Sequence, residues 1–311
     1  MKRLYLSLCY FLISFTLLAG NDTISNVDHF VNNKDSSGIA HRRITTLAIA
    51  GGAVYTGTMI GLYHFKYGDK LQSRFQINTV KNDWRMEMDG THHILAGYYI
   101  GRLGFDVLRC SGISERSSTW IAGLSGLFFL STQEIMDGFS TKWEASTGDE
   151  ATNILGSALF ISQQLVWHKQ KIVAKWSYHS TSFPSYRPDL LGSNFAQRMV
   201  KDYNGQTFWL SVNLYSFAGR DSRIPKWLNV AVGLGAAGIT GPVNTPPSTT
   251  ESIPYFEKRR LFYIAPDIDL TSIRTHSTAL KWLFEAIGFL KFPLPTLEIS
   301  GKGIKFHPLF F

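Results

Sequence analysis

The chain has 311 residues, enough for a sizeable core and one or two domains. Hydrophobic residues make up 44% of it and charged residues only 17%, which is apolar but short of a protein buried wholly in a membrane. The net charge is +8, yet no dense run of lysine and arginine appears. A basic balance fits binding to nucleic acid or to an anionic membrane surface, and without such a run we favour the membrane surface, or simple solubility, and expect no nucleic-acid partner.

The first residues have the pattern of a secretory signal. Met1, Lys2 and Arg3 give a positive start, residues 4–19 are apolar, and Gly20 closes the run. Residues 1–20 are therefore predicted to be a signal peptide, and the protein is expected in the cell envelope, either periplasmic or membrane-associated. An uncleaved anchor helix is the alternative reading of the same run. Cys9 would leave with the signal, so Cys110 stands alone and no disulfide framework is expected.

A polar leader and an apolar segment follow. Residues 21–43 are rich in Ser, Asn and Asp and predict a flexible leader. Residues 44–65 are apolar and uncharged up to Lys66, and they open a helical region predicted over residues 44–168. Gly57 and Gly61 form a G-x-x-x-G step, which allows another helix to approach closely, although tight packing of any kind explains the same glycines.

Three further apolar segments lie between Asp89 and Trp167. The first begins at Asp89, the second ends at Gly138 and the third begins at Gly148, with short connections between them. Read as antiparallel helices, they place the start of one beside the end of the next. Both a protein-buried and a membrane-spanning arrangement fit, because residues 117–133 are uncharged but fewer than the roughly 20 of a typical span. We therefore predict a mainly α protein, an antiparallel bundle of about four helices.

Polar side chains gather at the helix ends that should meet. Within each helix they are spaced by i, i+3 or i, i+4, so each pair lies on one helical face. The candidate catalytic residues are Asp89, His93, Glu134, Asp137, Asp149 and Asn153. Carboxylates, an imidazole and an amide are the groups of a hard-metal or general acid–base site. In such a site Glu134, Asp137 and Asp149 would hold a divalent metal, His93 would act as acid or base, and Asn153 would orient the substrate.

A structural role fits the same residues. Asp is a favourable N-cap, and acidic groups favour the positive end of a helix. Glu134 and Asp137 fit this role less well, because they lie at a predicted helix C-terminus. A negative charge there is unfavourable unless a cation, a proton or a partner compensates it. The polar cluster is thus either an active site or a knot that ties helix ends together.

After Lys169 the pattern changes to a smaller mixed α/β region, predicted over residues 169–311. The turn dipeptide Asn204-Gly205 precedes a β-rich run, and residues 227–239 fit a glycine-bearing strand or a loose helix. We predict strands over 206–212 and 261–270, a helix over 277–290 and a hairpin over 296–306. The strand at 261–270 alternates apolar and polar residues, so it has one apolar face.

Several segments carry a resemblance to a known family. They are Gln-Glu-Ile-Met-Asp-Gly-Phe-Ser at 133–140, the helix start at 148–156, Lys-Trp-Ser-Tyr-His at 175–179, Leu-Gly-Ser-Asn-Phe at 191–195 and Lys-Asp-Tyr-Asn-Gly-Gln-Thr at 201–207. Over nearly the whole mature chain, the sequence resembles the domain-of-unknown-function 2279 family of predicted envelope lipoproteins, also called YfiM-like. The resemblance implies an envelope location but no reaction. A lipobox cysteine is missing from the signal, so the resemblance does not extend to a lipid anchor.

A more distant likeness bears on mechanism. The order Asp-x-x-x-His, then Glu, then Asp-x-x-x-Asn-x-x-Gly is similar to the signature of VanZ-like membrane proteins. By that match the positions that carry over are Asp89, His93, Glu134, Asp149, Asn153 and Gly156. The chain has Gly90 where a Lys usually follows the Asp, so a fixed positive charge is missing there.

Together these features suggest a metal-dependent hydrolase or phosphotransferase that acts on a lipid-linked or cell-wall substrate, with membrane lipid as its expected partner and nucleic acid excluded. The alternative is a non-enzymatic envelope scaffold that binds lipid or a protein.

Overall fold

The computed structural model describes residues 37–68, 70–79, 85–86, 88–218, 222–241 and 254–311. The predicted signal over 1–20 and the part of the predicted leader over 21–36 lie outside the described residues. Contacts divide the chain into two compact units. Of the described residues, the helical unit comprises those over 37–79 and 92–168, and the sheet unit comprises those over 85–91 and 169–311.

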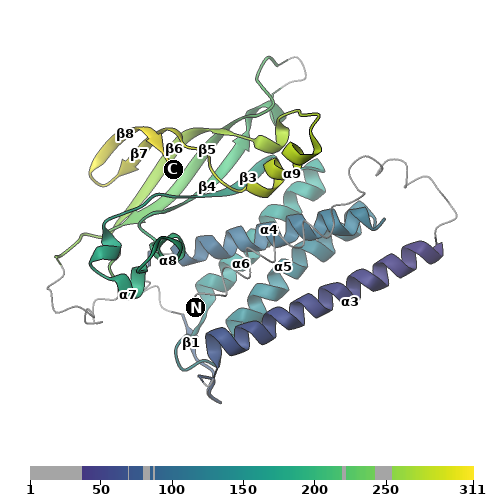
Figure 1. Cartoon of the computed structure of the whole chain (residues 1–311), viewed down its shortest axis with the longest axis horizontal. Helices are drawn as coiled ribbons and strands as arrows, with labels where there is room; N and C mark the ends of the chain where they lie inside the picture. Colours follow the sequence, from purple (N-terminus) through teal and green to yellow (C-terminus); the bar gives the residue numbers. More distant parts are fainter. Residues whose placement is uncertain (1–36, 69, 80–84, 87, 219–221, 242–253) are drawn as a thin grey trace. The chain divides into compact units, whose positions relative to one another are not determined.

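The fold is mixed α/β, and the prediction of a mainly α helical bundle with a smaller C-terminal region is wrong. Helices account for 49% of the structure and strands for 23%, and six of the strands form one antiparallel sheet (Figure 1). The prediction failed because a local sequence pattern predicts individual strands but not how they pair. Their assembly into one sheet depends on hydrogen bonds between residues far apart in the chain.

The helical unit is built on four long helices. They are α3 (Ser37–Leu62), which continues as the π-helical turn η1 (Tyr63–Tyr67), α4 (Met88–Cys110), α5 (Glu115–Gly138) and α6 (Thr147–Trp167). Two short parallel strands, β1 (Ile77–Asn78) and β2 (Ala145–Ser146), also belong to this unit. Ser114 and Ser146 cap α5 and α6 by accepting hydrogen bonds from backbone N–H groups in the first turn, which explains where these helices begin.

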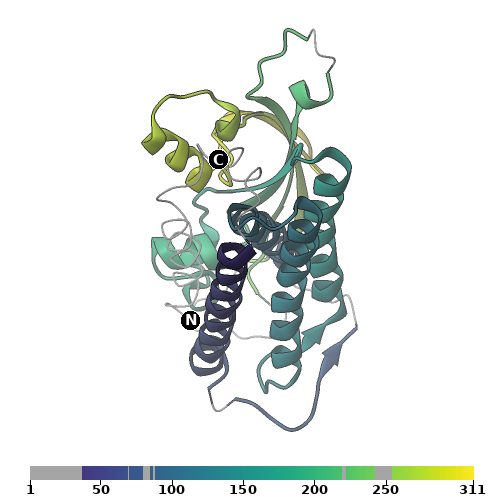
Figure 2. The ribbon, with the colours of Figure 1, turned by 90° about the vertical axis from the view of Figure 1, so that its right-hand side faces the viewer.

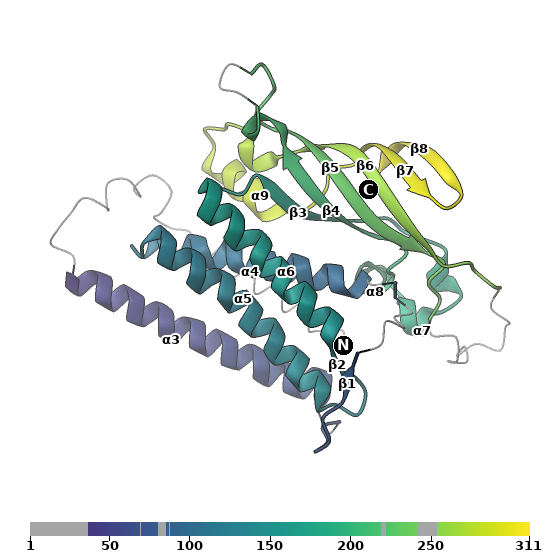
Figure 3. The ribbon, with the colours of Figure 1, turned by 180° about the vertical axis from the view of Figure 1, so that it is seen from behind.

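Glycines let α4, α5 and α6 pack backbone against backbone (Figures 1 and 3). A Cβ added to Gly126 on α5 would lie 2.9 Å from the carbonyl oxygen of Gly97 on α4. A Cβ added to Gly156 on α6 would lie 2.5 Å from the carbonyl oxygen of Ile94 on α4. Real Cβ atoms do not come that close to backbone oxygen, so these positions need glycine. The close approach brings the polar residues of the three helices together.

Helix α3 differs from the other three because little of it is covered. The segment Thr45–Tyr67 is, among the described residues, the one helix long and apolar enough to cross a membrane, and only 6% of its most apolar window is buried. Gly57 and Gly61 have nothing within 4 Å of an added Cβ, so no close helix approach is made at that step.

The sheet unit contains a six-stranded antiparallel meander in which each strand pairs with the next in sequence (Figure 3). Its strands are β3 (Ile172–Tyr178), β4 (Gln206–Asn213), β5 (Leu228–Ala237), β6 (Arg259–Ile268), β7 (Leu294–Ser300) and β8 (Gly303–Phe310). Its helices are α7 (Pro188–Leu191), α8 (Phe195–Lys201) and α9 (Thr278–Ile287), with 3-10 turns η2 (Phe183–Ser185), η3 (Leu214–Ser216) and η4 (Leu270–Ser272). Figure 2 shows that the strands twist and curve. Of residues 227–239, which fitted a strand or a helix, Leu228–Ala237 form strand β5.

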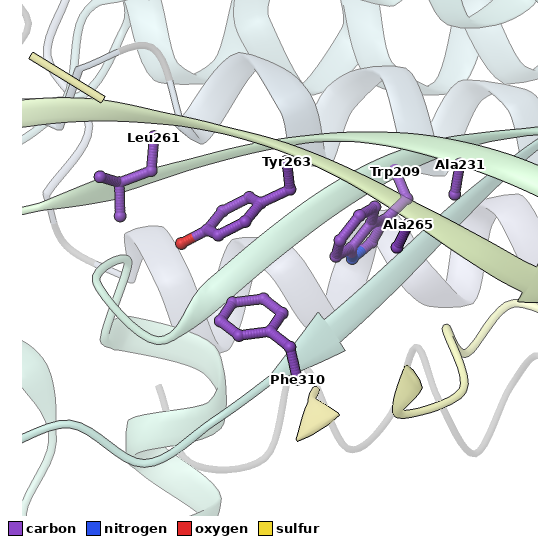
Figure 4. Packing of buried hydrophobic residues seen from close by; sticks show 6 residues of the cluster. All are labelled: Trp209, Ala231, Leu261, Tyr263, Ala265 and Phe310. Atoms are coloured by element: carbon purple, nitrogen blue, oxygen red, sulfur yellow. The ribbon is translucent and has the colours of Figure 1, made fainter. Parts of the chain in front are cut away.

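Three aromatic rings form the apolar core of the sheet unit (Figure 4). The ring of Tyr263 lies 5.7 Å from that of Trp209 and 4.6 Å from that of Phe310, measured between centroids. Gly233 makes room for the indole, because a Cβ there would lie 2.7 Å from Trp209. The indole Nε1–H donates to Ser177 Oγ at 2.9 Å, so the one polar atom of this ring is satisfied.

Candidate functional site

The helical unit brings His93, Glu134 and Asn153 together from three helices. His93 lies in the second turn of α4, Glu134 in the last turn of α5 and Asn153 in the second turn of α6. His93 Nδ1 is 2.8 Å from Asn153 Oδ1, and His93 Nε2 is 3.9 Å from Glu134 Oε1. The side chains of His93 and Glu134 are only 11% and 7% exposed. The imidazole therefore lies between an amide on one side and a buried carboxyl on the other.

A chain of hydrogen bonds fixes which nitrogen of His93 carries the proton. Ser131 Oγ donates to Glu150 Oε1 at 2.6 Å, and Asn153 Nδ2 donates to Glu150 Oε2 at 3.1 Å. Because the Glu150 carboxylate can only accept, the amide of Asn153 must turn its NH₂ group there and its oxygen toward His93. His93 then donates from Nδ1. In the neutral imidazole, the lone pair is left on Nε2, the nitrogen that faces Glu134.

Glu134 is an acidic group held at an unfavourable place. It lies near the C-terminus of α5, where the helix dipole disfavours a negative charge. Burial is the largest cause that raises the pKa of the Glu134 carboxyl, the charges of Asp149 and Asp137 add to it, and the Ser146 N–H and His93 lower it, with a net pKa of about 7. The Ser146 N–H donates to Glu134 Oε2 at 3.0 Å and so links this carboxyl to the start of α6. The carboxyl can accept or release a proton near neutral pH.

Asp137 is compensated by a cation. Lys66 Nζ lies 2.8 Å from Asp137 Oδ2, and Tyr67 donates its hydroxyl to Asp137 Oδ1 at 2.8 Å. Both residues belong to η1, directly after the apolar helix α3. Asp137 is therefore committed to an ion pair that joins the end of α3 to the end of α5. It also supplies negative charge beside Glu134.

Asp149 lies next to His93. A carboxylate oxygen of Asp149 and an imidazole nitrogen of His93 come within 4.8 Å of each other, a separation that one metal ion can bridge. The backbone N–H of Asp149 donates to Ser146 Oγ at 3.1 Å, in the cap that starts α6. Asp149 therefore has a position suited both to a cation and to the electrostatics of the helix start.

Asp89 has partners of its own in the sheet unit. It lies one helical turn before His93 on α4, as the sequence spacing predicts. Its Oδ1 accepts a hydrogen bond from the Tyr203 hydroxyl at 3.1 Å, and its Oδ2 pairs with Arg85. The contact with Tyr203 depends on tertiary structure and could not be predicted from the sequence, whereas Arg85 lies only four residues before Asp89, a spacing that local sequence shows.

Lys66, Tyr67, Glu150 and Ser131 also belong to the site, and no sequence pattern singled them out. Lys66 supplies a fixed positive charge, although not at the position where the VanZ-like pattern has one. The position of Lys66, the first charged residue after a long apolar run, could have indicated its role, since a cation at the end of such a run can pair with acidic residues at other helix ends. Glu150 carries a weaker signal, because it follows Asp149 directly in the first turn of α6.

Comparisons with protein-family models, with curated proteins and with solved structures find no match to this chain. The two resemblances described above therefore stay predictions, and the function has to be inferred from the site.

Proposed function

We propose that this chain is a membrane-associated hydrolase or phosphotransferase of the cell envelope, in which Glu134 and His93 act as an acid–base pair on a lipid-linked or cell-wall substrate. One observation carries the proposal. The Glu134 carboxyl, with a pKa of about 7, lies 3.9 Å from Nε2 of His93. Because Asn153 accepts a hydrogen bond from Nδ1 of the same ring, the lone pair of the neutral imidazole is on Nε2 and faces Glu134. Proton transfer is most effective when the pKa of the group lies near the working pH.

The two groups have complementary roles. Neutral His93, held by Asn153, can accept a proton at Nε2 from water or from a substrate hydroxyl. Protonated Glu134 can donate a proton to a departing oxygen, because burial keeps its pKa high. Asn153 and Glu150 are positioning residues, since they act on the reaction through the imidazole.

A divalent cation fits beside this pair. Asp149 and His93 offer two ligand atoms within 4.8 Å of each other. Glu134, predicted as a ligand, has its Oε1 3.9 Å from His93 Nε2. Asp137, predicted as a ligand with Glu134 and Asp149, has both oxygens engaged by Lys66 and Tyr67. A cation bound there would take up the Nε2 lone pair of His93 and favour the charged carboxylates, so it would replace the acid–base pair and act by polarising a phosphoryl or carbonyl oxygen.

The link to lipid comes from α3. The apolar segment ends at Lys66 and Tyr67, and the same two residues bind Asp137. If α3 crosses a bilayer, the polar site lies where that segment leaves the hydrocarbon, at the depth of lipid headgroups. A substrate with an apolar tail and a polar reacting group would then present that group at the site. Export to the envelope, as the first 20 residues predict, belongs to the same proposal.

The test combines metal analysis with matched variants. The full chain is purified in detergent, its metal content is measured, and Mg²⁺, Mn²⁺ and Zn²⁺ are titrated by calorimetry. Phosphoesters and lipid-linked cell-wall precursors are then screened with the wild type, Glu134→Gln and Asp149→Asn. Glu144→Gln is the control, because Glu144 is exposed in the same region.

We expect turnover that Glu134→Gln lowers by about 100-fold or more, as removal of a general acid does, with the control unaffected. Absence of turnover and metal, together with a loss of stability in both variants, would instead favour the non-enzymatic scaffold, in which the cluster ties helix ends.

A further inference from the structure

The sheet unit has an apolar row on the outward face of its sheet. Leu210, Val232, Ile264, Leu297 and Phe306 are register partners across the five strands β4 to β8. Their side chains are between 40% and 59% exposed. In a sheet with one solvated face, that face normally carries polar residues. This face carries aliphatic and aromatic residues instead.

A second apolar row lies two residues away along each strand, buried at its β4 end and exposed from β6 to β8. Phe208, Leu234, Phe262, Ile299 and Ile304 are again register partners from β4 to β8. The last three are exposed, and Ile304 is the most exposed of them at 74%. The ten side chains of the two rows include no polar or charged group. Contiguous apolar surface of this kind marks a contact with another apolar body.

The opposite face of the same sheet holds buried charge. Asp267 on β6 is fully buried, with its Oδ2 at 2.7 Å from Lys175 Nζ and its Oδ1 at 3.8 Å from Lys291 Nζ. Ser211 donates to Asp267 Oδ2 at 2.6 Å, and Asn229 is the register partner of Asp267. The strands therefore turn their ionised groups inward and leave apolar groups outside. Contact with water does not favour apolar side chains on the outward face, whereas contact with an apolar environment does.

Positive charge borders the apolar rows at one end of the sheet. Arg260 lies two residues before Phe262 on the same face of β6, and Phe262 pairs with Ile299 near the turn between β7 and β8. Lys302 lies in that turn and is exposed. Together with the net charge of +8, this border complements anionic headgroups around an apolar layer.

The open edge of the sheet restricts how deep the contact can be. Strand β8 pairs with β7 and, among the described strands, with no other. Its outer backbone groups need water or headgroups, so the sheet cannot lie within hydrocarbon. It can lie face down at the boundary between headgroups and acyl chains, as amphipathic surface elements do.

We propose that the outward face of the six-stranded sheet, formed by the two apolar rows, docks on the interface of an anionic phospholipid bilayer. The proposal rests on the sheet unit alone and is independent of the reaction proposed for the helical unit. An interface between two copies of the chain, and cover by another protein surface, are the competing occupants that the test separates.

The test uses site-specific probes in the full chain, since α3 could by itself bring the protein to vesicles. Both cysteines are replaced by Ser, and single cysteines are introduced by Val232→Cys or Ile264→Cys and labelled with a fluorophore. Arg223→Cys, at an exposed position in the loop before β5, is the matched control. Each protein is reconstituted into vesicles of phosphatidylglycerol and phosphatidylethanolamine, with and without a lipid that carries a nitroxide high on its acyl chain. Circular dichroism checks that the variants are folded.

We expect the nitroxide to quench the probes at 232 and 264 about threefold more strongly than the probe at 223, because a docked face reaches the acyl boundary. The difference should shrink in vesicles of phosphatidylcholine alone. A difference as large as in the anionic vesicles would show that docking does not need anionic lipid. Quenching at 232 and 264 no stronger than at 223 would overturn it. Disulfide cross-links between two Ile264→Cys chains, without quenching, would assign the face to a second copy.

Discussion

The substitution Glu134→Gln gives the sharpest test of the site, because the two roles of the cluster predict opposite effects on stability. A structural partner loses stability when it is replaced. If a carboxyl is instead held where its negative charge is unfavourable, the protein gains stability when that charge is removed. Glu134 lies near the C-terminus of α5, is buried, and has a pKa raised from 4.5 to about 7.

The magnitude follows from proton linkage. A folded-state pKa above the unfolded value means that the folded protein binds the proton more tightly. The stability contribution is therefore complete below pH 4.5 and is lost as the pH rises through 7. A shift from 4.5 to about 7 corresponds to about 3 kcal/mol. Gln is neutral at every pH, and its side-chain oxygen can still accept from the Ser146 N–H.

Relative to the wild type, Glu134→Gln should therefore change the free energy of unfolding by less than about 1 kcal/mol at pH 5 and raise it by up to about 3 kcal/mol at pH 8. Denaturant unfolding in a mild detergent at pH 5, 6, 7 and 8 measures this difference. Glu115→Gln is the control at the other end of α5. There the hydrogen bond from His168 lowers the pKa of Glu115, so its charge is stabilising and its loss should not raise stability at any pH. A Glu134→Gln protein that is less stable than the wild type at pH 8 would refute the reasoning.

Further substitutions, each measured by denaturant unfolding, test the packing and the ion pairs. Gly156→Ala should cost about 1–3 kcal/mol, because its Cβ would lie 2.5 Å from a backbone oxygen of α4, whereas Gly57→Ala on open α3 should be neutral or stabilise by up to about 1 kcal/mol. Lys66→Met should cost about 3 kcal/mol at pH 7, because it leaves Asp137 without its cation, and a second change of Asp137→Asn should recover most of the loss. Asp267→Asn should cost about 3–5 kcal/mol, because it leaves two buried lysines facing each other's charge, and equal stability to the wild type would contradict the pairing.

The helices around the site were predictable from the sequence for a simple physical reason. Long apolar runs with polar residues at their ends have to become helices, and short connections force their ends to meet. The predicted meeting of His93, Glu134 and Asn153 depends only on helix direction and spacing, and the structure places Asn153 Oδ1 at 2.8 Å and Glu134 Oε1 at 3.9 Å from the His93 imidazole. Lys66 and Tyr67 were not predictable, because η1 is a π-helical turn without a local signature and its partner Asp137 lies 71 and 70 residues away.

The sheet shows a different limit. The alternation over 261–270 predicts a strand with two unlike faces, and β6 has them. The period alone does not say which face is inside. Asp267 lies inside because Lys175 and Lys291, remote in sequence, neutralise it there, and Phe262 and Ile264 consequently point outward. The fold class was mispredicted for the same reason, since pairing and charge compensation between distant segments decide the architecture.

The order of residues after α3 also restricts the kind of substrate that the proposed enzyme can use. Lys66 and Tyr67 end the apolar segment and bind Asp137, and Asp137 raises the pKa of Glu134 one turn earlier on α5. The acid–base pair is thus tied to the point where the apolar segment ends. A soluble substrate would gain nothing from this connection. A substrate with an apolar tail would bind with the tail in the lipid and its reacting group at the depth of Glu134. Lengthening the tail should therefore lower KM while leaving kcat unchanged, because the tail contributes the same binding to the ground state and the transition state.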